Sequence, residues 1–316
     1  MKIQWLARAG LFLCVVASLQ ASTLTEDFSH DPLQNGWRVF GNSNLFQWNG
    51  TNHVLEVTWD STNSNSYFHR SLGTVLTPDD DFSVSFDLQL KDALALGYGS
   101  ELAVGLFRLS NAVSPAFSRG GGTAPNLFEF DYFPDTGFGD SINVTLVDTN
   151  GDYGHMYFAW DNKTLVPGQI YHIRMGHASG ATNATCEVFT NGVLWTALPF
   201  VYSQPIDDFR FDSVSISSYQ DDGLGDSILA HGTVANFSVT LPPAPVESLQ
   251  LSRINGNLNL TFSGRTNWFY TLERTLDFAS WISVSPTVAG TAGAMMLPDA
   301  SLAGIRAFYR IRACRP

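Results

Sequence analysis

The feature that most constrains the fold is a nine-residue stretch in which apolar and polar side chains alternate strictly. From Phe82 to Leu90 the sequence reads Phe-Ser-Val-Ser-Phe-Asp-Leu-Gln-Leu, with an apolar residue at every second position. Successive side chains of a β-strand point to opposite faces, so this period predicts a strand with one buried face. No segment shows a convincing amphipathic helix pattern. We therefore expect an all-β protein.

Weaker alternation predicts further strands along the first 240 residues. Asn191-Gly192 lies between two apolar runs and predicts a β-hairpin, because both central positions of that turn favour positive φ. Aromatic residues make up 13% of the chain and there are 27 glycines, a mixture typical of strands joined by turns. These observations predict a two-sheet jelly-roll sandwich over residues 22–240, with further strands at 53–59, 102–109, 128–133, 142–147, 171–175, 185–189 and 209–217.

A proline-rich stretch divides the chain into two expected domains. Residues 241–245 read Leu-Pro-Pro-Ala-Pro, which predicts a stiff, extended linker. Residues 246–316 then contain at least five short apolar runs, which predict a small β-sandwich. The stretches 270–281 and 308–312 resemble the small fibronectin-III-like modules that end many secreted bacterial proteins. That resemblance implies an Ig-like fold and the role of a spacer or anchor.

The N-terminal 21 residues have the pattern of a secretory signal peptide. Lys2 and Arg8 precede an apolar run from Leu11 to Leu19, and small residues follow it. Cleavage after Ala17 or after Ala21 agrees equally well with the pattern. We therefore expect a secreted or cell-surface protein whose chain has no membrane span.

Charge and cysteine content narrow the choice of partner. The chain has 17 basic and 29 acidic residues, a formal charge of −12, which argues against a nucleic-acid partner because phosphate binding needs clustered cations. Cys186 and Cys314 are the two cysteines beyond the predicted leader. A disulfide between them and two separate thiols are both compatible with the sequence.

The most informative segment for function is acidic and runs from Leu127 to Asp140. Glu129 and Asp131 lie two residues apart on a predicted strand, so their side chains share one face and repel each other unless a positive charge lies between them. Asp135 and Asp140 follow on a glycine-containing loop. Carboxylate and carbonyl oxygens are the ligands of calcium, so the segment is a candidate calcium site.

This segment resembles the metal-binding loop of legume-type lectins such as concanavalin A, in which Glu-x-Asp-x-aromatic-Pro-Asn leads through a Gly to a further Asp. The stretches 81–91 and 102–107 and the Gly-rich turn 120–122 occur in the order of that family's strands and turn, so the likeness covers about 70 residues. It implies a concanavalin A-like jelly roll that binds glycans. The calcium ligands that it implies are Glu129, Asp131, the carbonyl of Phe133, Asp135 and Asp140.

The sequence departs from the family at two positions. Thr145 lies near the place of the histidine that completes the family's transition-metal site, so the resemblance does not extend to a second metal. The family's sugar-binding Asp is replaced by Gly99-Ser100-Glu101, and Glu101 is the residue expected to substitute for it. Asp135 is expected to present its carboxylate to a glycan.

Two other interpretations of the acidic segment stay open. Glu129 and Asp131 can be the solvated face of an edge strand. They can also be the catalytic pair of a polysaccharide hydrolase or lyase, since laminarinase-like enzymes carry Glu-x-Asp-x-x-Glu on such a strand. Here Phe133 and Pro134 stand where the second glutamate is needed, so the motif is incomplete.

Aromatic residues in polar surroundings are candidates for stacking on sugar rings. Trp160 lies beside Asp161 and Asn162, and Tyr219 beside Gln220. A second acidic loop contains Asp221, Asp222 and Asp226, which suit either another calcium ion or a solvated turn.

The function expected from the sequence is calcium-dependent, non-catalytic binding of a polysaccharide or glycan outside the cell. A hydrolase or lyase and a structural or adhesive surface protein are the alternatives. No zinc-binding, serine-hydrolase, P-loop or dinucleotide motif appears in the sequence.

Overall fold

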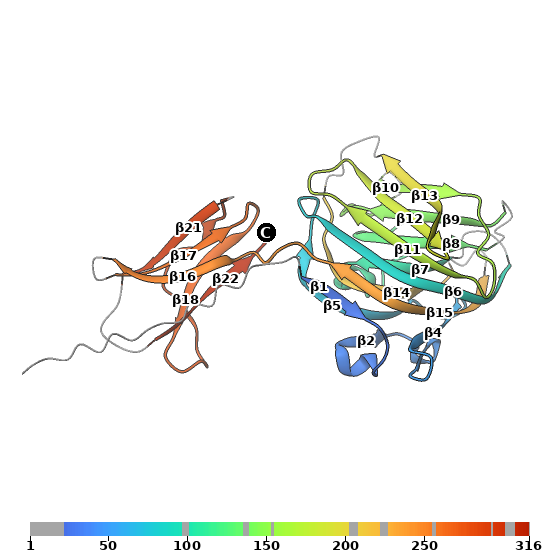
Figure 1. Cartoon of the computed structure of the whole chain (residues 1–316), viewed down its shortest axis with the longest axis horizontal. Helices are drawn as coiled ribbons and strands as arrows, with labels where there is room; N and C mark the ends of the chain where they lie inside the picture. Colours follow the sequence, from blue (N-terminus) through green and yellow to red (C-terminus); the bar gives the residue numbers. More distant parts are fainter. Residues whose placement is uncertain are drawn as a thin grey trace, which may run out of the picture. The chain divides into compact units, whose positions relative to one another are not determined.

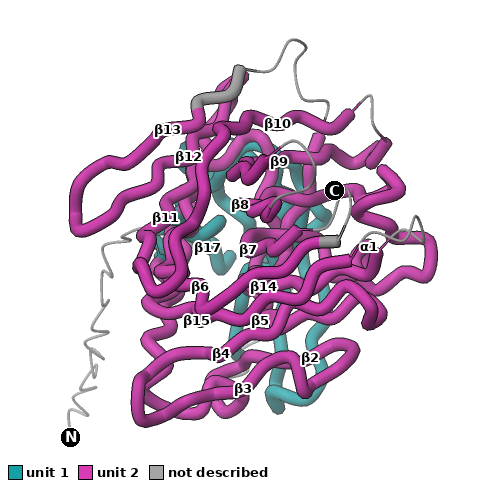
Figure 2. The backbone as a smooth tube through the Cα atoms, turned by 90° about the vertical axis from the view of Figure 1, so that its right-hand side faces the viewer, with its two compact units in different colours: residues 1–22, 243–316 teal, residues 23–242 magenta. Residues whose placement is uncertain are grey.

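The structure, a computed structural model, describes residues 22–96, 101–134, 139–152, 155–201, 208–221, 227–254, 257–291, 293–300 and 307–315. The predicted leader, residues 1–21, lies outside this range. Contacts divide the chain into two compact units, one spanning Thr23–Pro242 and the other containing Pro243–Pro316 (Figure 2). The division falls within the proline-rich stretch 241–245.

The larger unit contains two antiparallel sheets, and the first has eight strands (Figure 1). Its order is β13-β12-β11-β6-β15-β4-β3, and β1 pairs with β15. The strands are β1 (Thr23–Glu26), β3 (Phe46–Asn49), β4 (Val54–Asp60), β6 (Phe82–Leu96), β11 (Ile170–His177), β12 (Asn183–Thr190), β13 (Val193–Val201) and β15 (Ser227–Thr240).

The second sheet has seven strands in the order β10-β9-β8-β7-β14-β5-β2. Both edge strands come from sequence-distant parts of the unit, as expected of a jelly roll. The strands are β2 (Trp37–Phe40), β5 (Ser66–Leu76), β7 (Leu102–Phe107), β8 (Leu127–Phe133), β9 (Ser141–Val147), β10 (Met156–Asp161) and β14 (Phe211–Ser218).

Alternating side chains of both sheets form the main core. On β6, Phe82, Val84, Phe86, Leu88 and Leu90 are all buried, as the period of two predicts. They join the inward residues of the seven-stranded sheet in one continuous hydrophobic cluster. The predicted hairpin is also present, with φ of 52° at Asn191 and 74° at Gly192. The predicted all-β jelly-roll sandwich is confirmed.

A second, smaller cluster lies on the opposite face of the seven-stranded sheet. The segment between β7 and β8, which contains the short helix α1 (Leu109–Ala112), packs Ala112 and Phe117 against Tyr67, Phe107 and neighbouring side chains of that face. This segment therefore covers part of the outer face, which would otherwise be open to solvent.

The smaller unit has its own core and two sheets. A three-stranded sheet has the order β16-β17-β21, and in a four-stranded sheet β18 pairs with β19, β20 and β22. The strands are β16 (Glu247–Ile254), β17 (Asn257–Gly264), β18 (Phe269–Thr275), β19 (Ile282–Ser283), β20 (Val288–Ala289), β21 (Gly293–Asp299) and β22 (Phe308–Cys314). Its membership of the fibronectin-III class stays a prediction.

Both cysteines beyond the predicted leader are free thiols, Cys186 buried in β12 and Cys314 at the end of β22. Burial raises the pKa of the Cys186 thiol well above its usual range. Within the described ranges, no helix is long and apolar enough to cross a membrane.

Candidate functional site

The two central acids of the predicted site lie on an interior strand of the seven-stranded sheet. β8 is paired with β7 on one side and with β9 on the other. Glu129 is 1% exposed and Asp131 is fully buried, although both face away from the main core. The interpretation of this strand as a solvated edge strand is therefore wrong.

Small neighbours make room for these acids on the outer face. Gly105 and Ala103 on β7 lie directly opposite Glu129 and Asp131. A Cβ atom at Gly105 would collide with the β8 backbone at Phe128 and Glu129. Close approach of the two strands therefore depends on a glycine at this position.

The acids converge on a single guanidinium group, that of Arg119. Its Nε lies 2.6 Å from Oε1 of Glu129, and its Nη2 lies 3.1 Å from Oδ2 of Asp131. A third carboxylate, Glu101, places Oε1 3.3 Å from the same Nε. The positive charge that the spacing of Glu129 and Asp131 requires is thus supplied by the chain itself.

Hydroxyl groups complete the arrangement. Tyr219 donates to Oε2 of Glu129 at 2.7 Å, and Thr145 donates to Oδ2 of Asp131 at 2.6 Å. The Oδ1 atom of Asp131 is buried and has no hydrogen-bond partner. The carboxylates are therefore held in fixed positions, with one acceptor oxygen left over.

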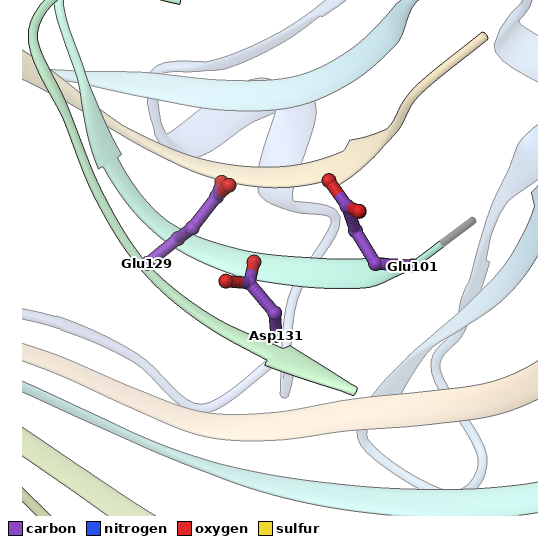
Figure 3. A group of neighbouring side chains, drawn as sticks. All are labelled: Glu101, Glu129 and Asp131. Carbon is purple, nitrogen blue, oxygen red and sulfur yellow. The ribbon is translucent and has the colours of Figure 1, made fainter. Parts of the chain in front are cut away.

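The carboxylates form a buried acidic triad, shown in Figure 3. Glu129 and Asp131 rise from β8, and Glu101 precedes β7. One oxygen of each lies within 4.8 Å of the others, a grouping that could hold a metal ion.

The charges in the triad do not balance. Three carboxylates face one guanidinium, so two negative charges remain if all three acids are ionised. Burial and the nearby Glu129 raise the pKa of Asp131 well above its usual range, and Arg119 opposes this only in part. Burial alone would lower the pKa of Arg119, but the three acids together raise it, so the guanidinium stays charged.

The triad does not accommodate a calcium ion while Arg119 is in place. Calcium needs six to eight oxygens at about 2.3–2.6 Å. The guanidinium nitrogens already lie against one oxygen of each carboxylate, which is where such an ion would bind. A metal and the Arg119 side chain would compete for the same space.

The structure describes two of the three remaining predicted calcium ligands, Phe133 and Asp140. Phe133 ends β8 with a half-buried side chain. Asp140 accepts a hydrogen bond from the Tyr132 hydroxyl at 3.2 Å, and Tyr132 belongs to the main core on the other face of β8. Asp135 lies outside the described residues. Among the residues that the structure describes, the third acid beside Glu129 and Asp131 is Glu101.

Two predicted sugar-binding residues are buried. Tyr219 is 5% exposed, packs beside Phe117 and donates its hydroxyl to Glu129, so its ring offers no stacking surface. Glu101 is also 5% exposed and contacts Arg119. The same burial counts against the hydrolase interpretation, because a polymer cannot reach Glu129 beneath the segment between β7 and β8.

Trp160, in contrast, is 58% exposed on β10, the edge strand of the sheet. Phe158, two residues earlier on the same face, is equally exposed. Across the strand pair, Trp160 lies opposite Asn143 and Phe158 lies opposite Thr145. The buried Oδ1 of Asn143 has no hydrogen-bond partner, and Asn143 in turn lies opposite Asp131.

A separate cavity of about 460 Å³ lies on the eight-stranded sheet. Asp87 in its wall is already engaged, with Oδ1 2.7 Å from Nδ1 of His172 and Oδ2 accepting from Asn236 at 2.7 Å. In the second acidic loop, Asp221 is described and its backbone N–H bonds to Ser61, whereas Asp222 and Asp226 lie outside the described residues.

Sequence reasoning missed Arg119, Thr145 and Tyr219 as partners of the acids. The available signal was the position of Arg119, which directly precedes the Gly-rich turn 120–122. Nothing local in the sequence links Tyr219 to Glu129, because 90 residues separate them.

No family model and no curated protein matches the sequence. Among solved structures, the carbohydrate recognition domain of Emp47p has a TM-score of 0.48 at 8% identity, covering 71% of this chain and 97% of that domain. The winged bean acidic lectin, in complex with methyl-α-D-galactose, has a TM-score of 0.46 at 12% identity, covering 71% and 100%. A legume lectin-like domain from Entamoeba histolytica has a TM-score of 0.43 at 11% identity, covering 68% and 95%. The ligand of the present chain has to be argued from its own residues.

Proposed function

We propose that this is an exported carbohydrate-binding protein whose ligand lies on the β10 edge of the seven-stranded sheet. The observation that carries the proposal is the pair of aromatic side chains, Phe158 and Trp160, each 58% exposed on one face of that strand. Large adjacent aromatic residues rarely face solvent without a binding role.

The spacing of the two rings suits sugar units of a chain. Residues two apart on a strand are about 6.5–7 Å apart along it, so the rings form a short apolar strip. A pyranose ring presents an apolar C–H face that such a strip can cover, while its hydroxyl groups remain at the rim. On the neighbouring strand, the half-buried Asn143 lies opposite Trp160.

A half-buried amide side chain beside the strip can supply a polar contact. Asn143 lies between Asp131 and Trp160 in the strand register, and its side chain is only partly buried. Sugar hydroxyls can form hydrogen bonds with such an amide. The chain's charge of −12 disfavours sulfated or uronic polymers, so we expect a neutral glycan.

An array of neutral and acidic oligosaccharides, followed by calorimetric titration of the retained glycan, tests this proposal. We expect Trp160→Ala to weaken binding at least about tenfold, because an aromatic contact of this kind is worth about 1.5–3 kcal/mol. Leu94→Ala is the matched control, since Leu94 is 57% exposed on the other sheet. The proposal fails if no glycan is retained, or if Trp160→Ala binds as tightly as the unaltered protein.

Whether glycan binding depends on calcium is a separate question, because Arg119 lies between the acids that were predicted to bind the ion. The glycan titration is therefore run once with calcium and once with a chelator. Export is tested by N-terminal sequencing of secreted protein, which should begin at Ser18 or Ser22. Either cleavage leaves β1 complete.

A role in adhesion is the second candidate, because the same exposed pair can dock on another protein. In that case the array stays empty, and Trp160→Ala abolishes attachment of cells or particles that display the protein. The smaller unit then acts as a spacer.

A further inference from the structure

The two buried acids on β8 share one cationic partner, Arg119. Arg119 contacts Glu129 at 2.6 Å, Asp131 at 3.1 Å and Glu101 at 3.3 Å, and it is only 7% exposed. Ionised carboxylates are costly to bury unless they are paired and hydrogen-bonded. The guanidinium meets both conditions, because its planar fork can reach two carboxylates at once.

Arg119 is held in position by a small closed turn. The backbones of Ser118 and Thr123 bond to each other at 3.0 and 2.9 Å, and Oγ of Ser118 accepts from the N–H of Gly121 at 3.0 Å. Just before this turn, Phe117 packs on Tyr219, with ring centroids 6.1 Å apart. The guanidinium therefore enters the triad from a segment that is anchored on both sides.

We infer that Arg119 is a built-in cation that takes the place of a divalent metal ion among Glu101, Glu129 and Asp131. Folding of this sheet then needs no calcium, and an ion can enter the triad only if the Arg119 side chain leaves. This inference concerns the triad alone and does not rest on the proposed glycan binding.

Thermal unfolding with and without calcium, manganese and EDTA, in the absence of any glycan, tests the inference on the full chain. We expect the Tm of the unaltered protein to be the same in all three conditions. Arg119→Ala should lower Tm by roughly 10 °C, because it leaves buried acids unpaired. Arg174→Ala is the control, since Arg174 pairs with Glu187 on the surface, and its Tm should change by less than about 2 °C.

The vacated space should then accept a metal. We expect calcium or manganese to raise the Tm of Arg119→Ala, and the double variant Arg119→Ala/Asp131→Asn to show no such rise. If Arg119→Ala does not fold, Arg119→Lys keeps the charge without the fork and should fold with a lowered Tm that calcium does not change.

Three results would overturn the inference. The first is a Tm of the unaltered protein that rises with calcium and falls with EDTA. The second is an Arg119→Ala protein as stable as the unaltered one. The third is an Arg119→Ala protein that is destabilised but unaffected by either metal. Because no glycan is present, none of these results depends on the proposed function.

Discussion

At the scale of single residues, the acids of β8 show how far a local pattern determines chemistry. The two-residue spacing of Glu129 and Asp131 places both carboxylates on one face and requires a positive charge between them. It does not determine which positive charge is used. Arg119 provides it, and Tyr219 and Thr145 bond to the carboxylate oxygens that face them.

Removing the hydroxyl of Tyr219 measures how much its hydrogen bond to Glu129 contributes to stability. Tyr219→Phe removes the donor to Oε2 of Glu129 and leaves a buried carboxylate oxygen unpaired. We expect the free energy of unfolding to fall by about 1–3 kcal/mol, measured by urea denaturation. Tyr132→Phe is the matched control, because the Tyr132 hydroxyl donates to Asp140, which is less buried. We expect this variant to lose less free energy of unfolding than Tyr219→Phe. Equal losses would contradict the role assigned to Tyr219.

His177 predicts how stability depends on pH. Burial lowers its pKa below the usual 6.5, and the nearby Asp80 and Asp81 oppose this only in part. Its ring is stacked on Phe82 at 5.4 Å and meets the edge of Phe209 at 5.3 Å. The unfolded chain binds a proton more readily, so the stabilisation is present above pH 6.5 and is lost as the pH falls towards the lower folded pKa.

Replacing the His177 ring tests the expected direction of this pH dependence. We expect the free energy of unfolding to drop as the pH is lowered from 7 to 5, and to drop less in His177→Phe, which keeps the aromatic contacts. Part of the pH dependence of the free energy of unfolding should remain in His177→Phe, because burial also lowers the pKa of His69. A steeper slope in His177→Phe would refute the assignment.

At the scale of elements, the sequence predicted strands where alternation is regular and missed them where it is interrupted. β6 follows a period of two from Phe82 to Leu90 and was found easily. β15 has a bulge between Ala235 and Ser238, where Asn236 has a φ of 48°. The bulge adds a residue, so the buried positions change from even to odd numbers and the period of two is interrupted within the strand.

The same reasoning explains which part of the site could be predicted. The shared face of Glu129 and Asp131 is a property of one strand and follows from its sequence. Arg119 enters from a loop without periodicity, and Tyr219 enters from the end of β14, so their contacts depend on the complete pairing of the sheet. The burial of β8 likewise depends on the segment between β7 and β8, which a strand pattern does not describe.

Gly105 tests the close approach of β7 and β8. In Gly105→Ala the new methyl group would meet the backbone of Phe128 and Glu129, so we expect a loss of about 1–3 kcal/mol in the free energy of unfolding. Gly176→Ala is the control, because a Cβ there meets its nearest neighbour, the carbonyl oxygen of Phe82, at an ordinary 3.5 Å. Chemical denaturation should give a lower free energy of unfolding for Gly105→Ala than for Gly176→Ala. A Gly105→Ala protein as stable as Gly176→Ala would show that the strands can move apart at no cost.

At the scale of the whole molecule, the two units have separate hydrophobic clusters. The larger unit is held by the clusters on the two faces of its seven-stranded sheet, and the smaller one by a cluster around Tyr270 and Leu272. The exposed pair Phe158 and Trp160 and the acidic triad all belong to the larger unit. Folding and ligand binding of that unit should therefore not need residues beyond the linker.

A chain that ends at Pro242 tests this independence. Leu241 is 7% exposed and belongs to the main core, so the cut has to follow it rather than precede it. We expect the shortened protein to keep the Tm of the larger unit within about 2 °C and to bind the same glycan with unchanged affinity. A chain that ends at Val239 should melt lower, because it loses the buried Leu241 and the Thr23↔Thr240 pair at the end of β1. If the Pro242 chain loses Tm or affinity as well, the smaller unit contributes to the fold or to the ligand site and is more than a spacer.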